Sequence, residues 1–458
     1  MAKLFTAGTI PRQGVPMRSL VVGGGGREHC IVRALERSGA EIYAVSGNRN
    51  PGIMRSAKEF HLLDPMDIDH VVSWAASRKV DLAVIGPEAP LGAGLSDALI
   101  SKGIATFGPT KAAARIETSK EYARNLMRKH NVQGLIDYWA FDDLASFQNW
   151  VKDCDFEFVI KPVGLTGGKG VKVWGDHFNS KPEAAKYAEE IVKDKIGGST
   201  KFLVEEKAVG EEFSLQVFTD GKKVVPMPLA QDHKRAYEGD KGPNTGGMGS
   251  YSDADHLLPF VTKSEQEGAL DIMNKTVDAM AAEGTPFRGC LYGGFINTAQ
   301  GPKVIEFNCR FADPECMNVL PIMLTDFAET CAAAAGGSLR ASAQFEPKAT
   351  VCKYVVPQGY GTKSIAGQPI EVDEKAISDS GAQLFWASVD EKDGKIVTAT
   401  SRSLAVVGIE DTLAAAEEVA EQALTHVKGQ LYVRHDIGKK DVVMKRVLHM
   451  KSLRKGRD

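Results

Sequence analysis

The sequence predicts a mixed α/β and α+β protein, with an N-terminal parallel-sheet α/β domain and a small C-terminal α+β domain. Between them we expect a two-part core with a mobile glycine-rich lid. Three observations lead to this prediction. Apolar strands alternate with helical segments up to residue 119, glycine-rich loops follow strands in the middle of the chain, and alternating strands return after Gly336-Gly337.

Length, charge and cysteine usage limit the class of protein. A chain of 458 residues is too long for one core, so about three or four domains are expected. A formal charge of −3 without a basic block predicts no nucleic-acid partner, and no apolar run is long enough to predict a membrane partner. Seven single cysteines without a CxxC pair are typical of a reduced, cytoplasmic protein. Residues 1–17 are a leader without the apolar stretch of a signal peptide.

The first strand and helix are joined by a glycine turn. Arg18–Val22 is a short buried strand, Gly23–His29 is the turn, and Cys30–Ser38 is the helix. Backbone N–H groups and the helix dipole favour a phosphate at such a junction. The dinucleotide fingerprint fails at its third glycine, which is Glu28 or His29, so a small phosphorylated substrate fits better than NAD. A tight packing turn is the alternative.

Further strand–helix alternation extends the parallel sheet. Leu82–Ile85 and Ala105–Phe107 are strands that end in glycine and proline. Ligands bind at the carboxyl ends of such strands, so the loops there should share one edge. These loops are Gly23–His29, Asn48–Gly52 and Gly86–Ala89. Glu88 is placed to meet a substrate amine or a sugar hydroxyl.

A lysine interrupts an apolar strand in the middle of the chain. After the helix Ser119–His130, the strand Phe158–Pro162 contains Lys161. A buried ammonium is unfavourable without a paired anion, so Lys161 predicts a bound phosphate. A snorkelling lysine at a sheet edge is the alternative.

The glycine-rich stretch Gly164–Val171 resembles a P-loop only superficially. Val163 stands where a Walker motif has its first glycine, and Gly170 stands where it has Ser or Thr. Gly170–Trp174 continues as a strand, so we interpret the stretch as a hairpin loop able to close over phosphates.

A second charged, glycine-rich stretch runs from Gln231 to Gly249. It follows a hairpin of Glu211–Thr219 and Val224–Met227. A loop of this length without its own structure is usually functional or disordered, and its charges favour an anion-binding lid. Ser264 and Glu267 then have the spacing of a capping box at the start of a helix.

The strand Lys303–Phe311 carries the densest chemistry. Alternation places Glu306, Asn308 and Arg310 on one face, with apolar side chains on the other. Carboxylate and amide oxygens suit Mg²⁺, while Arg310 suits a carboxylate or phosphate. One strand face therefore predicts a site for a metal–nucleotide and an anionic substrate. A solvated outer face with a chance Glu–Arg pair is the alternative.

Taken together, these stretches resemble ATP-grasp ligases, and more closely the phosphoribosylamine–glycine ligase family. The segments that carry the resemblance appear in the family's order. They are Gly23–His29, Gly86–Pro90, Phe107–Thr110, Lys161–Val171, Val204–Glu206, Gln231–Arg235, Gly242–Gly249 and Val304–Glu315. The C-terminal domain is the loosest match.

The resemblance implies a role for each matching position. Glu306 and Asn308 would bind Mg²⁺, with Mn²⁺ as an alternative metal. ATP, a substrate, would meet Lys120, Lys161, Lys169, Gly167, Gly168, Glu205, Glu206, Ala208 and Glu212. The phosphoribosyl substrate and glycine would meet Gly24, Gly25, Gly26, Arg27, Glu28, Asn50, Pro51, Gly52, Glu88, Asn244, Gly246 and Gly247. Arg310, Asp232 and Lys234 would be the catalytic residues.

The resemblance also implies a reaction and a division of the chain. Glycine would be joined to 5-phosphoribosylamine through a glycyl phosphate, with ATP converted to ADP and phosphate, in a monomer of purine biosynthesis. We expect five parts: the leader 1–17, a phosphoribosyl-binding domain 18–119, an ATP-grasp lid subdomain 120–200, an ATP-grasp core 201–340 with the Mg-ATP and glycine site, and a C-terminal domain 341–458.

Two departures from the family and two rival functions remain open. Ala312 and Cys316 replace the usual glycine and threonine beside the expected glycine site, and the strand Leu291–Phe295 lacks an acid for a second metal. Another ATP-grasp carboxylate–amine ligase or an ATP-dependent carboxylase would use the same metal strand. The second rival is a non-catalytic nucleotide-binding protein. The intact lysines and metal ligands argue against it.

Overall fold

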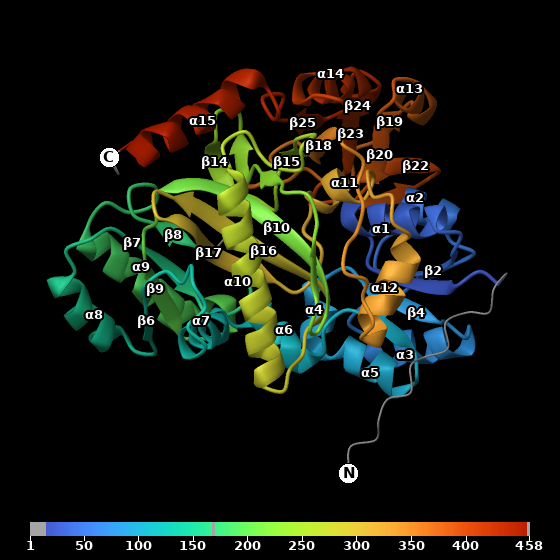
Figure 1. Ribbon diagram of the computed structural model, residues 1–458. Coiled ribbons are helices and arrows are strands. Elements are labelled where there is room, and N and C mark those ends of the chain that lie inside the picture. The colour runs from blue at the N-terminus through green and yellow to red at the C-terminus, as the bar shows by residue number, and fades with distance from the viewer. Residues whose placement is uncertain (1–14, 167–169, 456–458) are drawn as a thin grey trace, which may run out of the picture.

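The computed structural model describes residues 15–166 and 170–455, and a central antiparallel sheet lies between the N-terminal and middle parts of the chain (Figure 1). Gly167, Gly168 and Lys169, and the leader up to residue 14, lie outside the described residues. No helix within the described ranges is long and apolar enough to cross a bilayer.

The N-terminal part is a five-stranded parallel sheet in the order β3-β2-β1-β4-β5, as predicted. Its strands are β1 (Arg18–Val22), β2 (Glu41–Ser46), β3 (Glu59–Leu62), β4 (Leu82–Ile85) and β5 (Ala105–Phe107). Its helices are α1 (Gly26–Arg37), α2 (Pro51–Ser56), α3 (Ile68–Ser77), α4 (Glu88–Ala93), α5 (Leu95–Ser101) and α6 (Lys111–Thr118). The strand order reverses between β1 and β4, so the loops after these strands flank a crevice where ligands bind in such sheets.

Helix α1 begins four residues earlier than the predicted Cys30. Gly25 is its N-cap, and the Gly25 N–H donates to Glu28 Oε2 at 2.6 Å. The Glu28 carboxylate thereby satisfies an N–H group that a helix start leaves without a partner. Half of the predicted turn is therefore the first turn of the helix, which brings the helix N-terminus closer to the sheet edge.

The middle part has a four-stranded antiparallel sheet, β6-β9-β7-β8, with its own hydrophobic core of residues between 141 and 204. After α7 (Lys120–Lys129), its elements are β6 (Tyr138–Phe141), α8 (Leu144–Asp153), β7 (Phe158–Pro162), β8 (Lys172–Val173), α9 (Lys181–Asp194) and β9 (Phe202–Glu206). The predicted strand Gly170–Trp174 is reduced to the two residues of β8 that pair with β7.

The central sheet is antiparallel in the order β11-β10-β16-β17. Its strands are β10 (Gly210–Asp220), β11 (Val224–Pro226), β16 (Arg288–Thr298) and β17 (Gly301–Asn308), and its helices are α10 (Lys263–Ala282), α11 (Cys316–Val319) and α12 (Phe327–Gly336). Helix α12 packs between β5 and β10 and joins this sheet to the N-terminal part. The capping box of α10 is Thr262 with Glu265, two residues before the predicted pair, because Thr262 Oγ1 accepts from the Glu265 N–H at 3.3 Å.

A bulge in β17 changes which of its side chains face the core. Gly294 pairs with Glu306 but Phe295 pairs with Val304, so Ile305 is the extra residue. Val304 and Phe307 are buried while Ile305 is half-buried, so the predicted apolar face is wrong at Ile305. The strand also ends at Asn308 instead of Phe311, which places Arg310 in the following loop.

The segment from Gln231 to Gly249, predicted as a loop, contains short strands. They are β12 (Gln231–Asp232), β13 (Arg235–Tyr237), β14 (Lys241–Asn244) and β15 (Gly249–Ser252), and β13 pairs with β14 as a hairpin. The loop prediction is wrong here: β12 pairs with β15 and β13 with β14 inside the segment, and a strand distant in sequence extends this pairing. Strand β15 pairs with β18 (Ala349–Pro357) of the C-terminal part.

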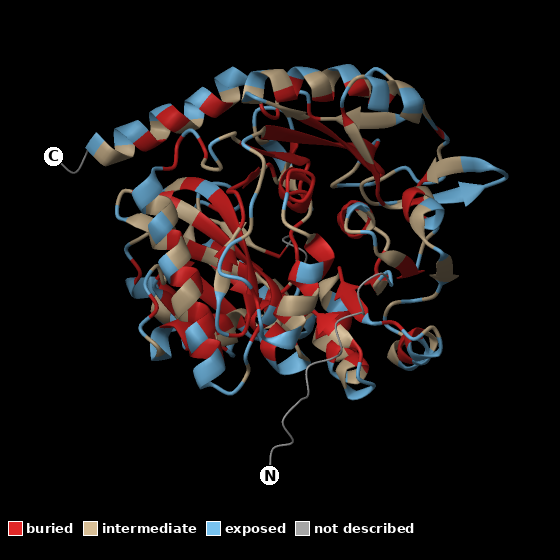
Figure 2. Cartoon of the chain, turned by 45° about the vertical axis from the view of Figure 1, so that its right-hand side comes forward, coloured by how far each residue is buried: buried red, intermediate tan, exposed pale blue. Residues whose placement is uncertain are grey.

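The C-terminal sheet runs in the order β12-β15-β18-β23-β20, with β25 also on β18. Its further elements are β19 (Ile370–Val372), α13 (Glu374–Asp379), β20 (Gln383–Trp386), β21 (Val389–Lys392), β22 (Lys395–Thr398), β23 (Leu404–Glu410), α14 (Leu413–Leu424), β24 (Val427–Gly429), β25 (Leu431–Val433) and α15 (Lys440–Lys455). The sheet borrows β12 and β15 from the middle of the chain, so it is not confined to residues after 336. Figure 2 shows α15 lying along the molecule with a partly buried face.

A buried histidine joins the N-terminal and C-terminal parts. His29 Nδ1 accepts from the Trp386 N–H at 2.8 Å, and the ring lies edge-on to Phe385 with centroids 5.6 Å apart. Asn50 Nδ2 donates to the Trp386 carbonyl at 2.7 Å. Burial, followed by the charges of Arg33 and Arg55, lowers the pKa of His29 to about 3. The ring is therefore neutral and accepts a hydrogen bond across this contact.

This contact predicts a pH dependence of stability. The pKa of His29 is about 3 in the folded protein and about 6.5 in an unfolded chain. The neutral ring therefore stabilises the folded protein fully at pH values above the unfolded-state pKa of about 6.5. This stabilisation is lost as the pH falls from there toward the folded-state pKa of about 3. Between about pH 7 and about pH 5, we expect the wild-type protein to lose about 2 kcal/mol more unfolding free energy than His29→Gln.

Urea unfolding at both pH values measures the difference. Carboxylates titrate in both proteins, so comparing the two slopes isolates the imidazole. Equal slopes would contradict the assignment of a neutral, buried His29.

Candidate active site

Three loops meet at the carboxyl edge of the N-terminal sheet, as predicted. The carboxamides of Asn48 and Asn50 donate to the Gly24 carbonyl at 3.3 and 3.1 Å. Asn50 also caps α2, where Pro51 follows, by accepting from the Gly52 N–H at 3.0 Å. The side chain of Asn50 is therefore occupied within the protein, and the backbone of the glycine turn remains as the predicted anion site.

Arg27 and Glu28 tie the glycine turn to the segment after β17. Arg27 Nε lies 2.6 Å from Glu28 Oε1, and Arg27 Nη1 donates to the Phe311 carbonyl at 3.2 Å. Both side chains are buried. Their charges are thus matched inside the protein, and they connect the turn to the residues beside Arg310.

Arg310 lies between two carboxylates from different elements. Its Nε is 3.3 Å from Glu88 Oε2, and its Nη2 is 3.0 Å from Glu117 Oε1. Although burial raises the pKa of Glu88, Arg310 and Arg27 outweigh it and hold that pKa at about 2. Glu117 also accepts from the Cys309 N–H at 2.6 Å. Glu117 was missed in the sequence, where nothing in α6 distinguishes it from a surface residue.

Asn308 lies against the same pair. With its amide oriented to satisfy both ends, Asn308 donates to Glu117 Oε1 and accepts from Arg310 Nη1, each at 3.2 Å. The amide oxygen is fixed beside the guanidinium and next to the face that carries Glu306. Asn308 and Glu306 thus point to the same side of β17, as the alternation predicts.

Glu306 is a carboxylate surrounded by cations. Burial raises its pKa, but Lys234, Lys161, Lys120 and Arg310 together lower it below the usual range. Lys234 Nζ lies 3.9 Å from Glu306 Oε1. Among the residues that the structure describes, no hydrogen-bond donor occupies this carboxylate. An ionised carboxylate with free oxygens fits the coordination of a divalent cation.

The rest of a metal site would have to come from outside the protein. Within the described ranges, no group of three His, Cys, Asp or Glu side chains has the geometry to hold a metal ion. Mg²⁺ keeps several waters and binds one or two protein oxygens together with substrate phosphates. Glu306 with Asn308 fits that pattern, and a site built by the protein alone does not.

Lys161 is paired inside the protein. Its Nζ lies 2.6 Å from Glu205 Oε2 and donates to the Ile305 carbonyl at 3.2 Å, while Arg124 Nε lies 2.8 Å from Glu205 Oε1. The anion beside Lys161 is thus the Glu205 carboxylate, whereas the sequence predicted a phosphate, which stays a prediction. The edge-lysine alternative is wrong, because Lys161 is buried on an inner strand of its sheet. Burial raises the pKa of Glu205, but Arg124 and Lys161 outweigh it and hold the value at about 2.

The other predicted nucleotide residues lie around this network. Lys120 Nζ donates to the Gly164 carbonyl at 2.8 Å, and burial lowers its pKa against the attraction of Glu306. Glu206 is exposed at the end of β9, and Ala208 is half-buried between β9 and β10. Glu212 lies 3.1 Å from Lys234 through Oε2. Gly167, Gly168 and Lys169 lie outside the described residues.

The hairpin segment faces the same region from the other side. Asp232 Oδ1 is enclosed without a hydrogen-bond partner among the described residues. Burial, followed by the neighbouring Glu315 carboxylate, raises the pKa of Asp232 well above its usual range. Gly247 lies beside it, since a Cβ there would be 2.7 Å from Asp232 Oδ1, and Asn244 and Gly246 flank this turn. Glu315 was missed in the sequence as a partner of Asp232.

The C-terminal part also reaches the site, although no chemistry was predicted for it. Arg402 donates to the carbonyls of Gly246 and Gly247, the latter at 3.2 Å, and Arg402 Nη2 lies 3.0 Å from Asp313 Oδ2. Tyr354 OH donates to Asp313 Oδ1 at 2.5 Å. A Cβ at Gly26 would lie 2.4 Å from Tyr354 OH, so only glycine fits there. No local sequence signal marks these two residues.

Comparison with known proteins places these features in one family. Three phosphoribosylglycinamide synthetase domains match the chain in order: the N domain at residues 17–117, the ATP-grasp (A) domain at 118–316 and the C domain at 350–440. The phosphoribosylamine–glycine ligase of Methanothermobacter thermautotrophicus is 51% identical over 96% of this chain and 100% of that protein. The ligase of Pyrococcus horikoshii is 48% identical over 96% of this chain and 98% of its own.

Solved structures agree with the sequence relatives. The phosphoribosylamine–glycine ligase of Thermotoga maritima aligns with a TM-score of 0.79 and 26% identity, over 92% of this chain and 100% of that one. The biotin carboxylase domain of the Hydrogenobacter thermophilus 2-oxoglutarate carboxylase aligns with a TM-score of 0.70 at 16% identity, over 96% and 95% of the two chains. The second likeness shows a shared fold.

Two adjacent glutamates provide a test of the buried ion pairs. Glu205→Gln leaves Arg124 and Lys161 without their carboxylate, which we expect to lower the unfolding free energy by about 3–5 kcal/mol. Glu206→Gln changes an exposed residue of the same strand and should alter it by less than about 0.5 kcal/mol. Urea unfolding at neutral pH measures both variants, and equal effects would show that the network contributes no net stability.

Proposed function

The chain belongs to the phosphoribosylamine–glycine ligase family, and from this membership we propose how its residues divide the work of the reaction. The enzyme joins glycine to 5-phosphoribosylamine in an ATP-dependent ligation of purine biosynthesis. The cluster of Lys120, Lys161, Lys234 and Arg310 around Glu306 carries the proposal, because every reactant contributes negative charge.

We propose that the glycine carboxylate attacks the γ-phosphate of ATP and forms glycyl phosphate and ADP. Arg310 and Lys234 face the two anions that must meet and offset their repulsion. Lys120 and Lys169 contact the phosphates directly. Glu205 and the Ile305 carbonyl take two of the three N–H donors of Lys161, so this lysine contributes charge and at most one hydrogen bond to a phosphate.

Glu306 and Asn308 are the residues we propose to hold Mg²⁺, with Mn²⁺ as an alternative. When bound, the metal supplies charge neutralisation at the ATP phosphates. The low pKa of Glu306 keeps its carboxylate ionised, and the Glu117–Arg310 pair fixes the amide of Asn308. The backbone between Glu205 and Ala208 would receive the adenine, and Glu212 the ribose.

The phosphate of 5-phosphoribosylamine is proposed to bind at the glycine turn Gly24–Gly26, in which Glu28 already holds the Gly25 N–H. The helix dipole of α1 favours an anion at this position. Pro51 and Gly52 border this turn, and Glu88 lies between it and Arg310. The amine then displaces phosphate from glycyl phosphate. Asp232 is proposed to accept the amine proton, because burial and the Glu315 carboxylate raise its pKa and make it a stronger base than an exposed aspartate.

The division of the chain supports separate sites for the co-substrates. We propose a phosphoribosyl-binding domain at 18–119, an ATP-grasp lid subdomain at 120–200, a core at 201–340 and a C-terminal domain at 341–458. The separate hydrophobic core between residues 141 and 204 supports the second of these. We also propose a monomer in the cytoplasm, and the burial of all seven cysteines as free thiols supports a reducing compartment.

The reaction is tested by ADP release from the purified protein with ATP, Mg²⁺ and glycine, with and without freshly made 5-phosphoribosylamine. We expect sustained ADP release only with both co-substrates, because glycyl phosphate is consumed by the amine. ADP release that is independent of the amine, or equal release with another acid in place of glycine, would overturn the substrate assignment.

The metal strand is tested by Glu306→Gln, which removes the ionised oxygen without changing size. We expect kcat to fall by about a hundredfold or more in a variant that still folds. Glu329→Gln, at an exposed Glu–Arg pair on α12, is the matched control and should keep normal turnover. Normal turnover by Glu306→Gln would mean that the metal strand is misassigned.

A further inference from the structure

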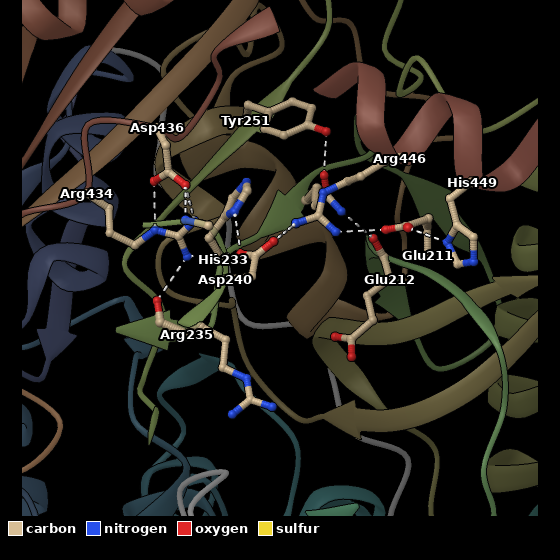
Figure 3. A network of polar contacts seen from close by, with 12 residues as sticks. Glu211, Glu212, His233, Arg235, Asp240, Tyr251, Arg434, Asp436, Arg446 and His449 are labelled. Atoms are coloured by element: carbon tan, nitrogen blue, oxygen red, sulfur yellow. Dashed lines mark hydrogen bonds and ion pairs between the residues drawn. The ribbon is translucent and has the colours of Figure 1, made fainter. Parts of the chain in front are cut away.

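The C-terminal arm, residues 431–455, binds a hairpin of the active site through the ion pairs of Arg434 and Arg446 with Asp240 (Figure 3). We call these contacts the grip. The hairpin consists of β13 and β14, with Asp240 at its turn. We propose that Arg434 and Arg446 are positioning residues: by holding Asp240 they fix the hairpin, and through it Lys234, for the ligation. Neither arginine contacts the substrate region described above.

Arg434 forms the inner half of the grip. Its side chain is fully buried and binds Asp436 through two hydrogen bonds of 2.9 and 2.7 Å. The remaining nitrogen, Nη1, donates to Asp240 Oδ1 at 3.1 Å and to the Arg235 carbonyl at 3.0 Å. Asp436 also accepts from the Gly239 N–H at 2.9 Å. The arm therefore binds both a hairpin strand and the hairpin turn.

Arg446 forms the outer half of the grip from helix α15. Its Nη2 donates to Asp240 Oδ2 at 2.9 Å, and its Nη1 donates to Glu211 Oε2 at 2.7 Å. Figure 3 shows Asp240 between the two arginines. Both carboxylate oxygens of Asp240 are thus bound by the arm. Glu211 belongs to the central sheet, so Arg446 also fixes the hairpin relative to β10.

The inner end of the hairpin lies at the site. Lys234 immediately precedes β13, and its Nζ contacts Glu212 at 3.1 Å and Glu306 at 3.9 Å. Glu211 and Glu212 are neighbours on β10 and project to opposite sides of the strand. One side therefore meets the arm through Arg446 and the other meets Lys234. Glu211 and Glu212 are adjacent in β10, so the contact with Arg446 and the contact with Lys234 lie one residue apart along the same strand.

The hairpin also reaches the middle part of the chain. Arg235 Nη2 lies 2.6 Å from Asp176 Oδ2, beyond β8. The same residue offers its carbonyl to Arg434. Arg235 thus connects the arm to the subdomain that contains β6–β9. Displacement of the hairpin would therefore move Lys234 and would also weaken the ion pair between Arg235 and Asp176.

A short hairpin needs such support. Two strands joined by a turn are marginally stable in water, and the β13–β14 pairing is interrupted between Arg235 and Tyr237. Asp240 has a φ of +58°, in the left-handed region that few non-glycine residues adopt. Buried charge pairs of this kind fix a geometry, and loss of one partner leaves the other uncompensated.

The test compares Arg446→Gln with Arg454→Gln. Both arginines lie on α15, but Arg454 pairs with Glu265 of α10, away from the hairpin. For Arg446→Gln we expect faster amide hydrogen exchange in residues 235–244 and a fall in kcat of about tenfold or more. The KM for 5-phosphoribosylamine should stay within about twofold, because the glycine turn is untouched. Arg454→Gln should match the wild type in both measurements.

Asp240→Asn provides a second variant that leaves the arm intact and should reproduce both effects. Unchanged exchange in residues 235–244 of both variants overturns the proposal, as does faster exchange with unchanged kcat. The inference rests on the proposed role of Lys234, which Lys234→Ala tests separately. Full turnover by Lys234→Ala would overturn that role, while hydrogen exchange in the arm variants would still report on the grip.

Discussion

The Glu205 carboxylate, held between Arg124 and Lys161, is the interaction on which the site depends. Two cations cannot remain in a dry interior without an anion, and Glu205 supplies it. The three residues come from α7, β7 and β9, and the Ile305 carbonyl extends the contact to β17. The bulge at Ile305 directs that carbonyl toward the two cations. The same contact therefore fixes the middle subdomain against the strand that carries Glu306.

Two further cations of the site follow the same rule. Arg310 is held by Glu88 and Glu117, and Lys234 by Glu212. Each cation is oriented by the protein before any ligand arrives, so little reorganisation is needed when negative charge develops. Glu306 differs because no hydrogen-bond donor of the described residues occupies its oxygens. An array of fixed positive charges around one free carboxylate is an arrangement that accepts a metal-bound polyphosphate.

Local sequence patterns predicted the N-terminal sheet, the edge shared by its loops, and the common face of Glu306 and Asn308. These features depend on a period of two and on strand order, which neighbouring residues determine. The patterns failed where partners are distant. Asp240 and Arg434 are 194 positions apart, so a segment held by ion pairs resembled a charged loop. The bulge at Ile305 and the roles of Glu117, Tyr354 and Arg402 likewise depend on tertiary packing.

The C-terminal part completes the site at two places, which explains why its residues carry no local signature. Tyr354 and Arg402 grip Asp313 beside the glycine turn, and Arg402 also binds the Gly246 carbonyl. The arm grips the other end of the same hairpin segment through Asp240. The C-terminal part therefore holds this segment at its turn and beside its base, and Lys234 lies at the base, where its carbonyl accepts from the Thr245 N–H. Under the proposed assignment, a phosphoribosyl substrate at the glycine turn and the lysine beside Glu306 then share one frame, which is the geometric condition for bringing the substrate amine to the activated glycine.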